Sequence, residues 1–261
     1  MAFLNNKNPW LVILNQPDMI RCVLICCHYG GGSAAAFRGW EKDLPKGVLL
    51  IGIQLPGRES RFSETLISSL SLIVEQLSNA LSPFINIPYI LFGHSIGGLI
   101  CFELTRALRK FSLPLPNCLI ISATNAPQKL IVREHISDKS DEEFINCLRL
   151  YNGLPDELIV DPQMMSIFMP MLRADLQILE TYQYEEKTPL NCKLVVLGGL
   201  NDPTVPLEDI AAWSIHTNFS CNIRLFPGNH FFIKSHKKEV LAYLSEVIQS
   251  QLSMEFCNVK I

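Results

Sequence analysis

Three features that would place this chain in other protein classes are missing from its sequence. No apolar run reaches the roughly 18 residues that a membrane-spanning helix needs, and residues 10–14 are too short for the core of a signal peptide. The formal net charge of −3 provides no basic field to attract nucleic acid. The cysteines form no repeated Cys-x-x-Cys pairs, which argues against a zinc site. We therefore expect no metal, no cofactor, no nucleic-acid partner and no membrane segment.

The cysteines also point to a redox environment. Nine is an odd number, so the cysteines cannot all pair into disulfides. Cys22, Cys26 and Cys27 lie inside an apolar run, where cysteine behaves as a small hydrophobic residue. This pattern predicts a reducing compartment, and we expect a cytoplasmic protein.

What the sequence does contain is an alternation of short apolar runs with helical patterns. The runs are apolar on both faces, as the strands of a buried parallel sheet must be. They cover residues 21–27, 47–53, 89–92, 118–122, 193–198 and 222–226, and helical periodicity covers 68–81, 96–108 and 237–252. The alternation predicts a doubly wound α/β fold with a mostly parallel sheet, and the length fits a single domain over residues 1–261.

Residues 126–186 interrupt this alternation. They contain helical patterns broken by prolines but no convincing strand. A stretch of that length is too long for a plain loop, so we expect it to carry its own helices. One hypothesis is a helical lid over the active site, and the alternative is a fixed helical layer that never moves.

A short glycine-flanked motif follows the third apolar run. Gly93-His94-Ser95-Ile96-Gly97 has the Gly-x-Ser-x-Gly spacing of a nucleophile elbow, with a strand before it and a helix after it. The sharp turn at the serine leaves no room for side chains at the two glycines. The motif predicts an α/β-hydrolase with Ser95 as nucleophile, and the alternatives are an ordinary tight turn or a hydrolase fold without activity.

A serine nucleophile needs a base, which in this fold follows the serine along the chain. Four histidines do so: His135, His216, His230 and His236. His230 follows the last predicted strand, at the kind of strand end where doubly wound sheets carry functional groups. The other three lie in polar or helical contexts. We therefore predict His230 as the base.

The acid that orients the base should follow the preceding strand. Asp202 stands in the loop after residues 193–198, whereas Asp209 and Asp175 are explained by a following helix and by the insertion. Aspartate before proline is also a common turn residue, so Asp202 before Pro203 can serve both purposes.

The developing oxyanion needs two backbone N–H donors. The N–H of Ile96, at the start of the helix, is one, and residues 28–32 form the glycine-rich loop expected to supply the other. A phosphate-binding loop is the competing interpretation, but neither a P-loop nor a dinucleotide pattern is completed. His28 precedes the serine and is interpreted as structural.

Five stretches together resemble a known family, the type II thioesterases that accompany polyketide and nonribosomal peptide synthetases. They are residues 28–32 with Phe37 and Trp40, 54–59 with Arg61, 93–98, 172–175 leading to Tyr182, and Gly198-Gly199 with Asp202-Pro203 followed by 226–232. The likeness extends over nearly the whole chain. The family usually has proline and then alanine where His28 and Gly30 stand here.

The resemblance implies a catalytic triad, a partner and a substrate. Ser95 would be the nucleophile, His230 the base and Asp202 its orienting acid, with Gly30 and Ile96 as the oxyanion donors. The substrate would be an acyl group on the phosphopantetheine arm of an acyl- or peptidyl-carrier protein in polyketide, nonribosomal peptide or fatty acid biosynthesis. No cofactor is implied, and we expect a monomer.

Two alternatives and one structural question stay open. The chain could be a carboxylesterase or lipase for small esters, or a carrier-binding protein without activity. Arg58, Glu59 and Arg61 match the family, and the favoured interpretation of this charged group is a buried ion pair that fixes its loop.

Overall fold

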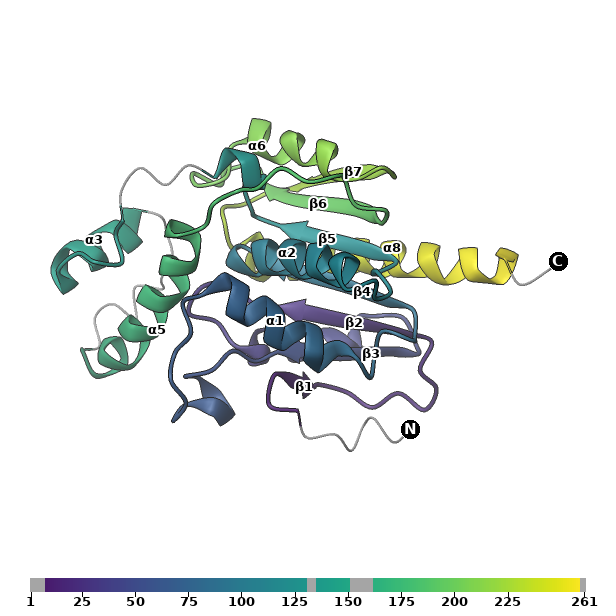
Figure 1. The fold of residues 1–261 in the computed structure, drawn as a ribbon, viewed down its shortest axis with the longest axis horizontal. Helices are drawn as coiled ribbons and strands as arrows, with labels where there is room; N and C mark the ends of the chain where they lie inside the picture. Colours follow the sequence, from purple (N-terminus) through teal and green to yellow (C-terminus); the bar gives the residue numbers. More distant parts are fainter. Residues whose placement is uncertain (1–7, 131–134, 151–161, 259–261) are drawn as a thin grey trace.

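The apolar runs of the sequence form the strands of one sheet. A computed structural model describes residues 8–130, 135–150 and 162–258. Within them, seven strands lie in the order β1-β3-β2-β4-β5-β6-β7 (Figure 1). Every neighbouring pair is parallel except β1 and β3. The strands are β1 Leu11–Ile13, β2 Cys22–Cys27, β3 Val48–Ile53, β4 Tyr89–His94, β5 Cys118–Ser122, β6 Lys193–Gly199 and β7 Cys221–Phe226.

Six of these strands confirm the predicted runs, and the short edge strand β1 was not predicted. Its three residues pair antiparallel with β3, Leu11 opposite Ile53 and Ile13 opposite Ile51. Three residues are too few for any periodicity to be read. The strand forms because β3 offers an unpaired edge, which is a tertiary cause.

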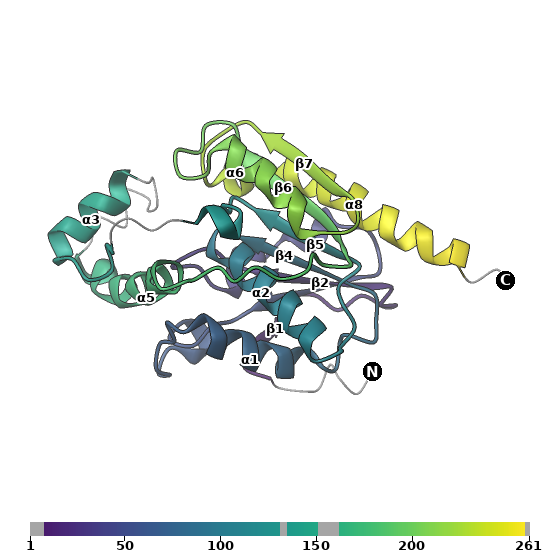
Figure 2. The same cartoon turned by 45° about the horizontal axis from the view of Figure 1, so that its top comes forward.

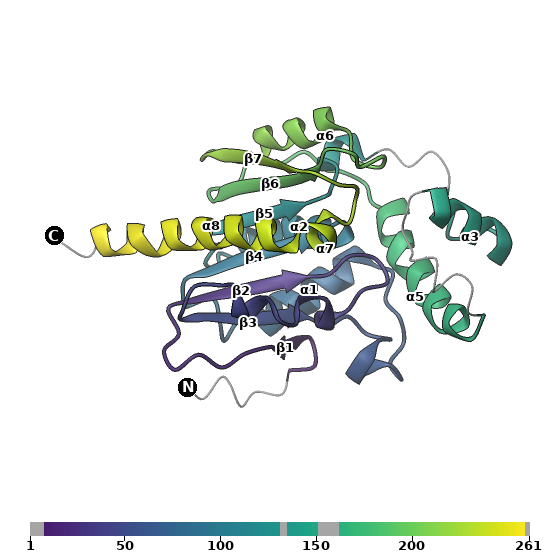
Figure 3. The same cartoon turned by 180° about the vertical axis from the view of Figure 1, so that it is seen from behind.

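Helices cover both faces of the sheet, and each face has its own core. On β2, Val23 and Ile25 pack in the cluster that includes α1 and α2, while Leu24 packs in the cluster that includes α8. Figures 1 and 3 show α1 and α2 on one face and α8 on the other. The helices are α1 Leu70–Leu81, α2 Ile96–Lys110, α3 Asp141–Leu150, α5 Pro162–Glu180, α6 Leu207–Ala211, α7 Phe232–Ser235 and α8 Lys237–Asn258.

The predicted insertion is helical and lies outside the two-faced sheet. Helices α3 and α5 come between β5 and β6 along the chain, and the described residues of 126–186 contain no strand. Figures 1 and 2 show both helices beyond the ends at which the parallel strands terminate. Residues 131–134 and 151–161 of the predicted lid lie outside the described part of the chain.

The described residues offer neither a membrane-spanning helix nor a cluster of metal ligands. None of the described helices is both long enough and apolar enough to cross a lipid bilayer. The same residues contain no group of three or more histidine, cysteine, aspartate or glutamate side chains arranged to hold a metal ion.

Candidate active site

Ser95 stands at a strained turn between β4 and α2. Its φ of 56° and ψ of −124° lie in a region that residues with a side chain rarely adopt. The Ser95 N–H donates to the Ser122 carbonyl at 2.8 Å, and its carbonyl accepts from the Thr124 hydroxyl at 2.8 Å. These bonds to β5 and its following loop hold the turn, so the Ser95 side chain projects beyond the strand ends.

The glycines of the elbow are required by close backbone contacts. A Cβ atom on Gly93 would lie 2.1 Å from the carbonyl oxygen of Gly97, and one on Gly97 would lie 2.4 Å from that of Cys27. Neither backbone can yield without moving a central strand. The packing therefore leaves no room for side chains at these two positions, as the motif predicted.

The structure brings Ser95, His230 and Asp202 into one hydrogen-bonded line. His230 Nε2 lies 2.9 Å from Ser95 Oγ, and His230 Nδ1 lies 2.7 Å from Asp202 Oδ2. Because an ionised carboxylate only accepts, Nδ1 carries the hydrogen and Nε2 is left to accept from the serine hydroxyl. The three residues follow β4, β6 and β7, whose parallel ends meet at the same edge of the sheet.

Thr204 is a fourth member of this group that the sequence did not indicate. Its N–H and its hydroxyl both donate to Asp202 Oδ1, at 2.8 and 2.7 Å, and the hydroxyl oxygen lies 3.0 Å from His230 Nδ1. The N–H bond is the turn bond expected of Asp202 before Pro203, so the turn and the histidine contact use different carboxylate oxygens. The signal was the spacing of two residues between Asp202 and Thr204.

Burial and hydrogen bonding act in opposite directions on Asp202. Its carboxylate is fully buried, which on its own raises the pKa. The bonds from His230 and Thr204 stabilise the ionised form and outweigh burial, so the pKa lies below its usual range. Asp202 is therefore negatively charged at neutral pH beside the histidine.

Gly30 and Ile96 face the same pocket as the serine. Ile96 is the first residue of α2, so its N–H is among those that have no partner inside the helix. Gly30 belongs to the loop after β2 and lines the pocket together with Ser95 and His230. The two backbone positions predicted as donors therefore line the same pocket.

The pocket itself is small and mostly apolar. Its volume is about 230 Å³, and it is lined by residues that follow the strands and by residues of the insertion. The leucines among its lining residues are Leu130, Leu148, Leu172, Leu176 and Leu179. The insertion therefore supplies much of the apolar surface around Ser95, while the hydrogen-bonding groups come from the strand ends.

The expected buried ion pair is present, with an unexpected partner. Arg58 binds Asp175 of α5 through two hydrogen bonds, Nη1 to Oδ2 at 2.9 Å and Nη2 to Oδ1 at 2.8 Å. Glu59 is exposed and accepts from the Ser33 hydroxyl, while Arg61 binds Glu64. Asp175 is thus a helix residue of the insertion, as predicted, but it also reaches the loop after β2.

Asp175 also bears on the phosphate-loop alternative. The N–H of Gly31 donates to Asp175 Oδ2 at 2.7 Å. A carboxylate therefore already occupies a donor that a phosphate group would need, and its charge would repel a pyrophosphate. The glycine-rich loop does not have the free donors of a dinucleotide cradle.

Comparison with known proteins decides the family, since residues 23–248 match the Thioesterase domain family. The chain belongs to the thioesterase family. Over 253 residues it is 37% identical to the gramicidin S biosynthesis protein GrsT of Aneurinibacillus migulanus, which covers 97% of this chain and 99% of that protein. It is also 37% identical over 246 residues to linear gramicidin dehydrogenase LgrE of Brevibacillus parabrevis, covering 93% and 94%.

Solved structures agree with the sequence matches. The type II thioesterase BorB from the borrelidin biosynthetic cluster superposes with a TM-score of 0.84 at 28% identity, covering 95% of this chain and 99% of that one. The predictions of an α/β-hydrolase fold and of a thioesterase similar to those of synthetase clusters are confirmed.

The other candidate histidines of this thioesterase have no hydrogen bond to the serine in the described part of the chain. His135 is exposed in the insertion, His216 is buried beside Gln128, and His236 follows α7. His28 is fully buried and its Nδ1 lies 2.8 Å from the Tyr29 carbonyl oxygen. Burial, followed by the nearby Arg58 charge, lowers the pKa of His28 to about 4, so it is neutral at neutral pH and only a weak base.

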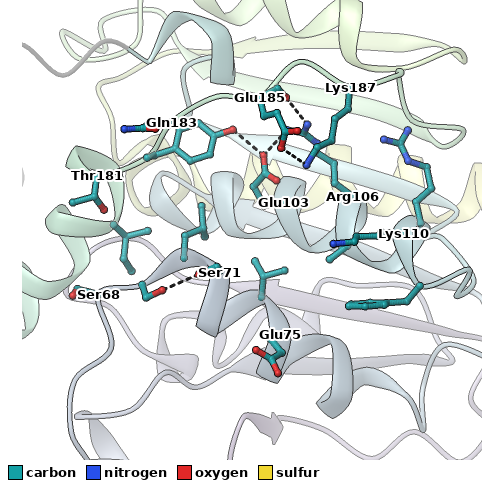
Figure 4. Close-up of a pocket in the computed structure, with 18 of the residues that line it drawn as sticks. Ser68, Ser71, Glu75, Glu103, Arg106, Lys110, Thr181, Gln183, Glu185 and Lys187 are labelled. Carbon is teal, nitrogen blue, oxygen red and sulfur yellow. Dashed lines mark hydrogen bonds and ion pairs between the residues drawn. The ribbon is translucent and has the colours of Figure 1, made fainter.

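A larger hollow of this thioesterase lies on the α1 and α2 side and does not contain the triad. It has a volume of about 990 Å³, and four of its charged groups form two ion pairs (Figure 4). Arg106 binds Glu103 at 2.7 Å and Lys187 binds Glu185 at 2.8 Å. None of the groups drawn there forms a nucleophile and base pair, so size alone does not mark the site.

Proposed function

We propose that this chain hydrolyses acyl thioesters held on the phosphopantetheine arm of acyl- or peptidyl-carrier proteins, with Ser95 as nucleophile, His230 as base and Asp202 as its orienting acid. The observation that carries the proposal is the line of hydrogen bonds from Ser95 Oγ through His230 to Asp202, at 2.9 and 2.7 Å. The family match and the relatives from peptide and polyketide gene clusters support the substrate class.

In the first half-reaction the serine becomes acylated. Ser95 Oγ attacks the thioester carbonyl carbon while its proton passes to His230 Nε2. The carbonyl oxygen becomes negative and accepts hydrogen bonds from the N–H groups of Gly30 and Ile96. The carbon–sulfur bond then breaks, and the departing sulfur takes the proton from His230 to leave as the pantetheine thiol.

In the second half-reaction water releases the acid. A water molecule gives a proton to His230 Nε2 and attacks the acyl–serine carbonyl carbon. The same two N–H groups stabilise the second oxyanion. The bond from carbon to Ser95 Oγ breaks, and His230 returns its proton to that oxygen. The products are a free carboxylic acid and the unmodified enzyme.

The pocket lining favours an apolar acyl group. Leucine side chains from the insertion surround the space above Ser95, whereas polar groups gather at the triad. Burial of methylene groups against such a wall stabilises binding by about 0.8 kcal/mol each. The insertion therefore sets the acyl preference in this proposal.

The name of one relative, linear gramicidin dehydrogenase LgrE, contains the word dehydrogenase, an activity that would need a nicotinamide cofactor. The contact between Gly31 and Asp175 opposes this, because it places a carboxylate where a dinucleotide would place its phosphates. An oxygen-ester hydrolase and a non-catalytic carrier-binding protein remain as outcomes of the test below.

The test is a hydrolysis panel that varies the carrier and the bond at a fixed acyl chain. Acyl groups of increasing length would be offered on a carrier protein, on coenzyme A and as matched oxygen esters, to the wild type and to Ser95→Ala. We expect faster hydrolysis of carrier-bound thioesters and no turnover by Ser95→Ala. A preference for the oxygen esters would make the chain an esterase, and turnover by Ser95→Ala would remove the serine mechanism.

The proposal includes a monomer in a reducing, cytoplasmic environment. Eight cysteines of the described residues are all free, which is consistent with such a compartment. Size-exclusion chromatography with light scattering tests the oligomeric state, and a mass corresponding to two chains would contradict it.

A further inference from the structure

The loop after β2 is held by a charged side chain from the insertion. Asp175 Oδ2 accepts from the Gly31 N–H at 2.7 Å and from Arg58 Nη1 at 2.9 Å, while its Oδ1 accepts from Arg58 Nη2 at 2.8 Å. Arg58 Nη1 also donates to the Gly32 carbonyl at 3.0 Å. The carboxylate from α5 thus holds the Gly30–Gly31 peptide directly and the Gly32–Ser33 peptide through Arg58.

Helix α5 and the loop are in close contact at this point. Gly31 has a φ of +70°, and a Cβ atom there would lie 2.6 Å from Leu172 Cδ2, one turn before Asp175 on α5. The side chains of Asp175 and Arg58 are 0% and 3% exposed. Loop and helix therefore meet through one apolar and one ionic contact, both shielded from water.

The fixed loop carries the proposed oxyanion donor. Gly30 N–H belongs to the same planar peptide as the Tyr29 carbonyl, so the two groups point in opposite directions. That carbonyl accepts from the Gly32 N–H at 2.9 Å and faces His28 Nδ1 at 2.8 Å. The next peptide is held at its N–H by Asp175. Bonds on both sides of Gly30 therefore set the direction of its N–H relative to Ser95.

Stability alone is a poor explanation of this pair. A buried ion pair is expensive to desolvate, and well-packed apolar residues in its place are commonly neutral or stabilising. An ion pair with a second function at the loop is better explained, because apolar residues could fill the space but could not bind the Gly31 N–H and the Gly32 carbonyl.

We propose that Asp175 and Arg58 are positioning residues, through which helix α5 of the insertion fixes the Gly30–Gly32 loop and so completes the oxyanion hole. The inference rests on the proposed hydrolytic function of Ser95. It assigns the insertion two tasks: its leucines line the acyl pocket, and the buried carboxylate of Asp175 orients the backbone donor. Neither residue touches the reacting atoms.

The decisive variant replaces both charges at once. Arg58→Met with Asp175→Leu removes the pair without leaving an uncompensated charge, so the fold is expected to melt within a few degrees of the wild type. We expect kcat for an S-acyl-N-acetylcysteamine thioester to fall about 10²-fold, similar to the loss of one oxyanion donor, with KM changed less than about threefold. Hydrogen exchange at the Gly31 amide should accelerate.

A matched control comes from the same helix. Arg173 binds Asp141 within the insertion at 2.7 Å, two positions before Asp175. Arg173→Met removes an ion pair of α5 that does not reach the loop, and kcat should stay within about twofold. If the double variant does not fold, Asp175→Asn provides the test, because its amide oxygen can still accept from Gly31. We expect about a tenfold loss of kcat for it.

A second readout separates this inference from the proposed substrate. A fluorophosphonate reagent modifies an activated serine and places its phosphoryl oxygen in the oxyanion hole, without any need for thioester hydrolysis. Its reaction with Ser95 should slow in the double variant in parallel with kcat, even if the wild type proves inactive on carrier proteins. A folded double variant with wild-type kcat and wild-type phosphonylation, or a loss confined to KM, would overturn the proposal.

Discussion

The sheet with its flanking helices, here called the body, and the insertion of this thioesterase differ in the size of their buried cores. Two extensive clusters of buried side chains sandwich the sheet, and central residues such as Phe92 and Leu91 have no exposed surface. The buried part of the insertion's own cluster is Ile136, Phe144, Leu148 and Leu172. A small core supplies less free energy of folding, so the insertion depends more on its contacts with the body.

Those contacts are both apolar and polar, since Ile178 of α5 packs in one of the two clusters of the body. The polar contacts include Asp175 with Arg58, the Tyr182 hydroxyl, which donates to Glu103 Oε1 at 2.8 Å, and Arg106 Nη2, which donates to the Glu185 carbonyl. The difference indicates a division of labour. The body carries the hydrogen-bonded line of Ser95, His230 and Asp202, while the insertion supplies apolar lining to the pocket.

The largest expected effect breaks the chemistry of the body without touching the insertion. Asp202→Asn presents an amide to His230 Nδ1 and favours the wrong histidine tautomer, so kcat should fall about 10⁴-fold. Steady-state hydrolysis and thermal unfolding of the same variant measure this. Asp209→Asn on α6 is the matched control and should stay within twofold of wild type. Activity retained in Asp202→Asn would exclude Asp202 as the orienting acid.

A pair of core truncations compares the two regions directly. Phe92→Ala in the body and Phe144→Ala in the insertion each remove a fully buried phenyl ring, a change that typically costs about 3–5 kcal/mol. We expect Phe92→Ala to lower the global unfolding free energy by that amount. Phe144→Ala should instead raise hydrogen exchange across α3 and α5 and leave the strands protected. Equal loss of strand protection in both variants would show that the regions unfold together.

Acid should weaken the body through its buried histidines. Burial and neighbouring charge lower the pKa of His28 to about 4, and burial and Arg106 lower that of His216 to about 4. The unfolded chain binds these protons near pH 6.5, so stability is complete above pH 6.5 and is lost as pH falls towards 4.

The size of this effect can be isolated at His28. A folded pKa near 4 corresponds to about 3 kcal/mol once the unfolded histidine is fully protonated. His28→Asn keeps a donor for the Tyr29 carbonyl but cannot titrate, so its free energy of unfolding should decline less between pH 6.5 and 4. Urea unfolding at several pH values measures the slope of that free energy against pH. An identical slope in wild type and variant would refute a neutral buried His28.

The smallest effect concerns one attachment of the insertion. Tyr182→Phe removes a hydrogen bond to Glu103 and should cost about 1–2 kcal/mol. Because this hydrogen bond joins the segment after α5 to α2, its loss should appear as faster amide hydrogen exchange in α5, with kcat within threefold. Faster exchange in β4 or β5 instead would place Tyr182 among the supports of the body.

Much of the body could be predicted because its signals are local. Apolar runs predicted β2 to β7, although β7 at the edge of the sheet is largely exposed, and the glycines around Ser95 predicted the elbow. His230 and Asp202 were placed by chain order and strand ends, and the structure brings both to Ser95. The strand β1 was missed because its pairing comes from the edge of β3 and not from its own three residues.

The contacts between body and insertion could not be predicted from local sequence patterns. The sequence favoured a buried ion pair around Arg58, but its partner Asp175 stands 117 residues further along the chain. Thr204 carries no motif, although its distance of two residues from Asp202 fits a turn. Neither contact follows from periodicity, because each depends on which loops the strand order brings together.

The sequence by itself therefore predicted six of the seven strands, the elbow and the three residues that the structure places in one hydrogen-bonded line, since each is marked by local pattern or by position after a strand. Only the tertiary structure decided that α5 of the insertion reaches the Gly30–Gly32 loop and binds it through Asp175. The physical reason is that a buried charge must find its partner in space. Chain order fixes which strand end a residue follows, but packing fixes which distant side chain neutralises it.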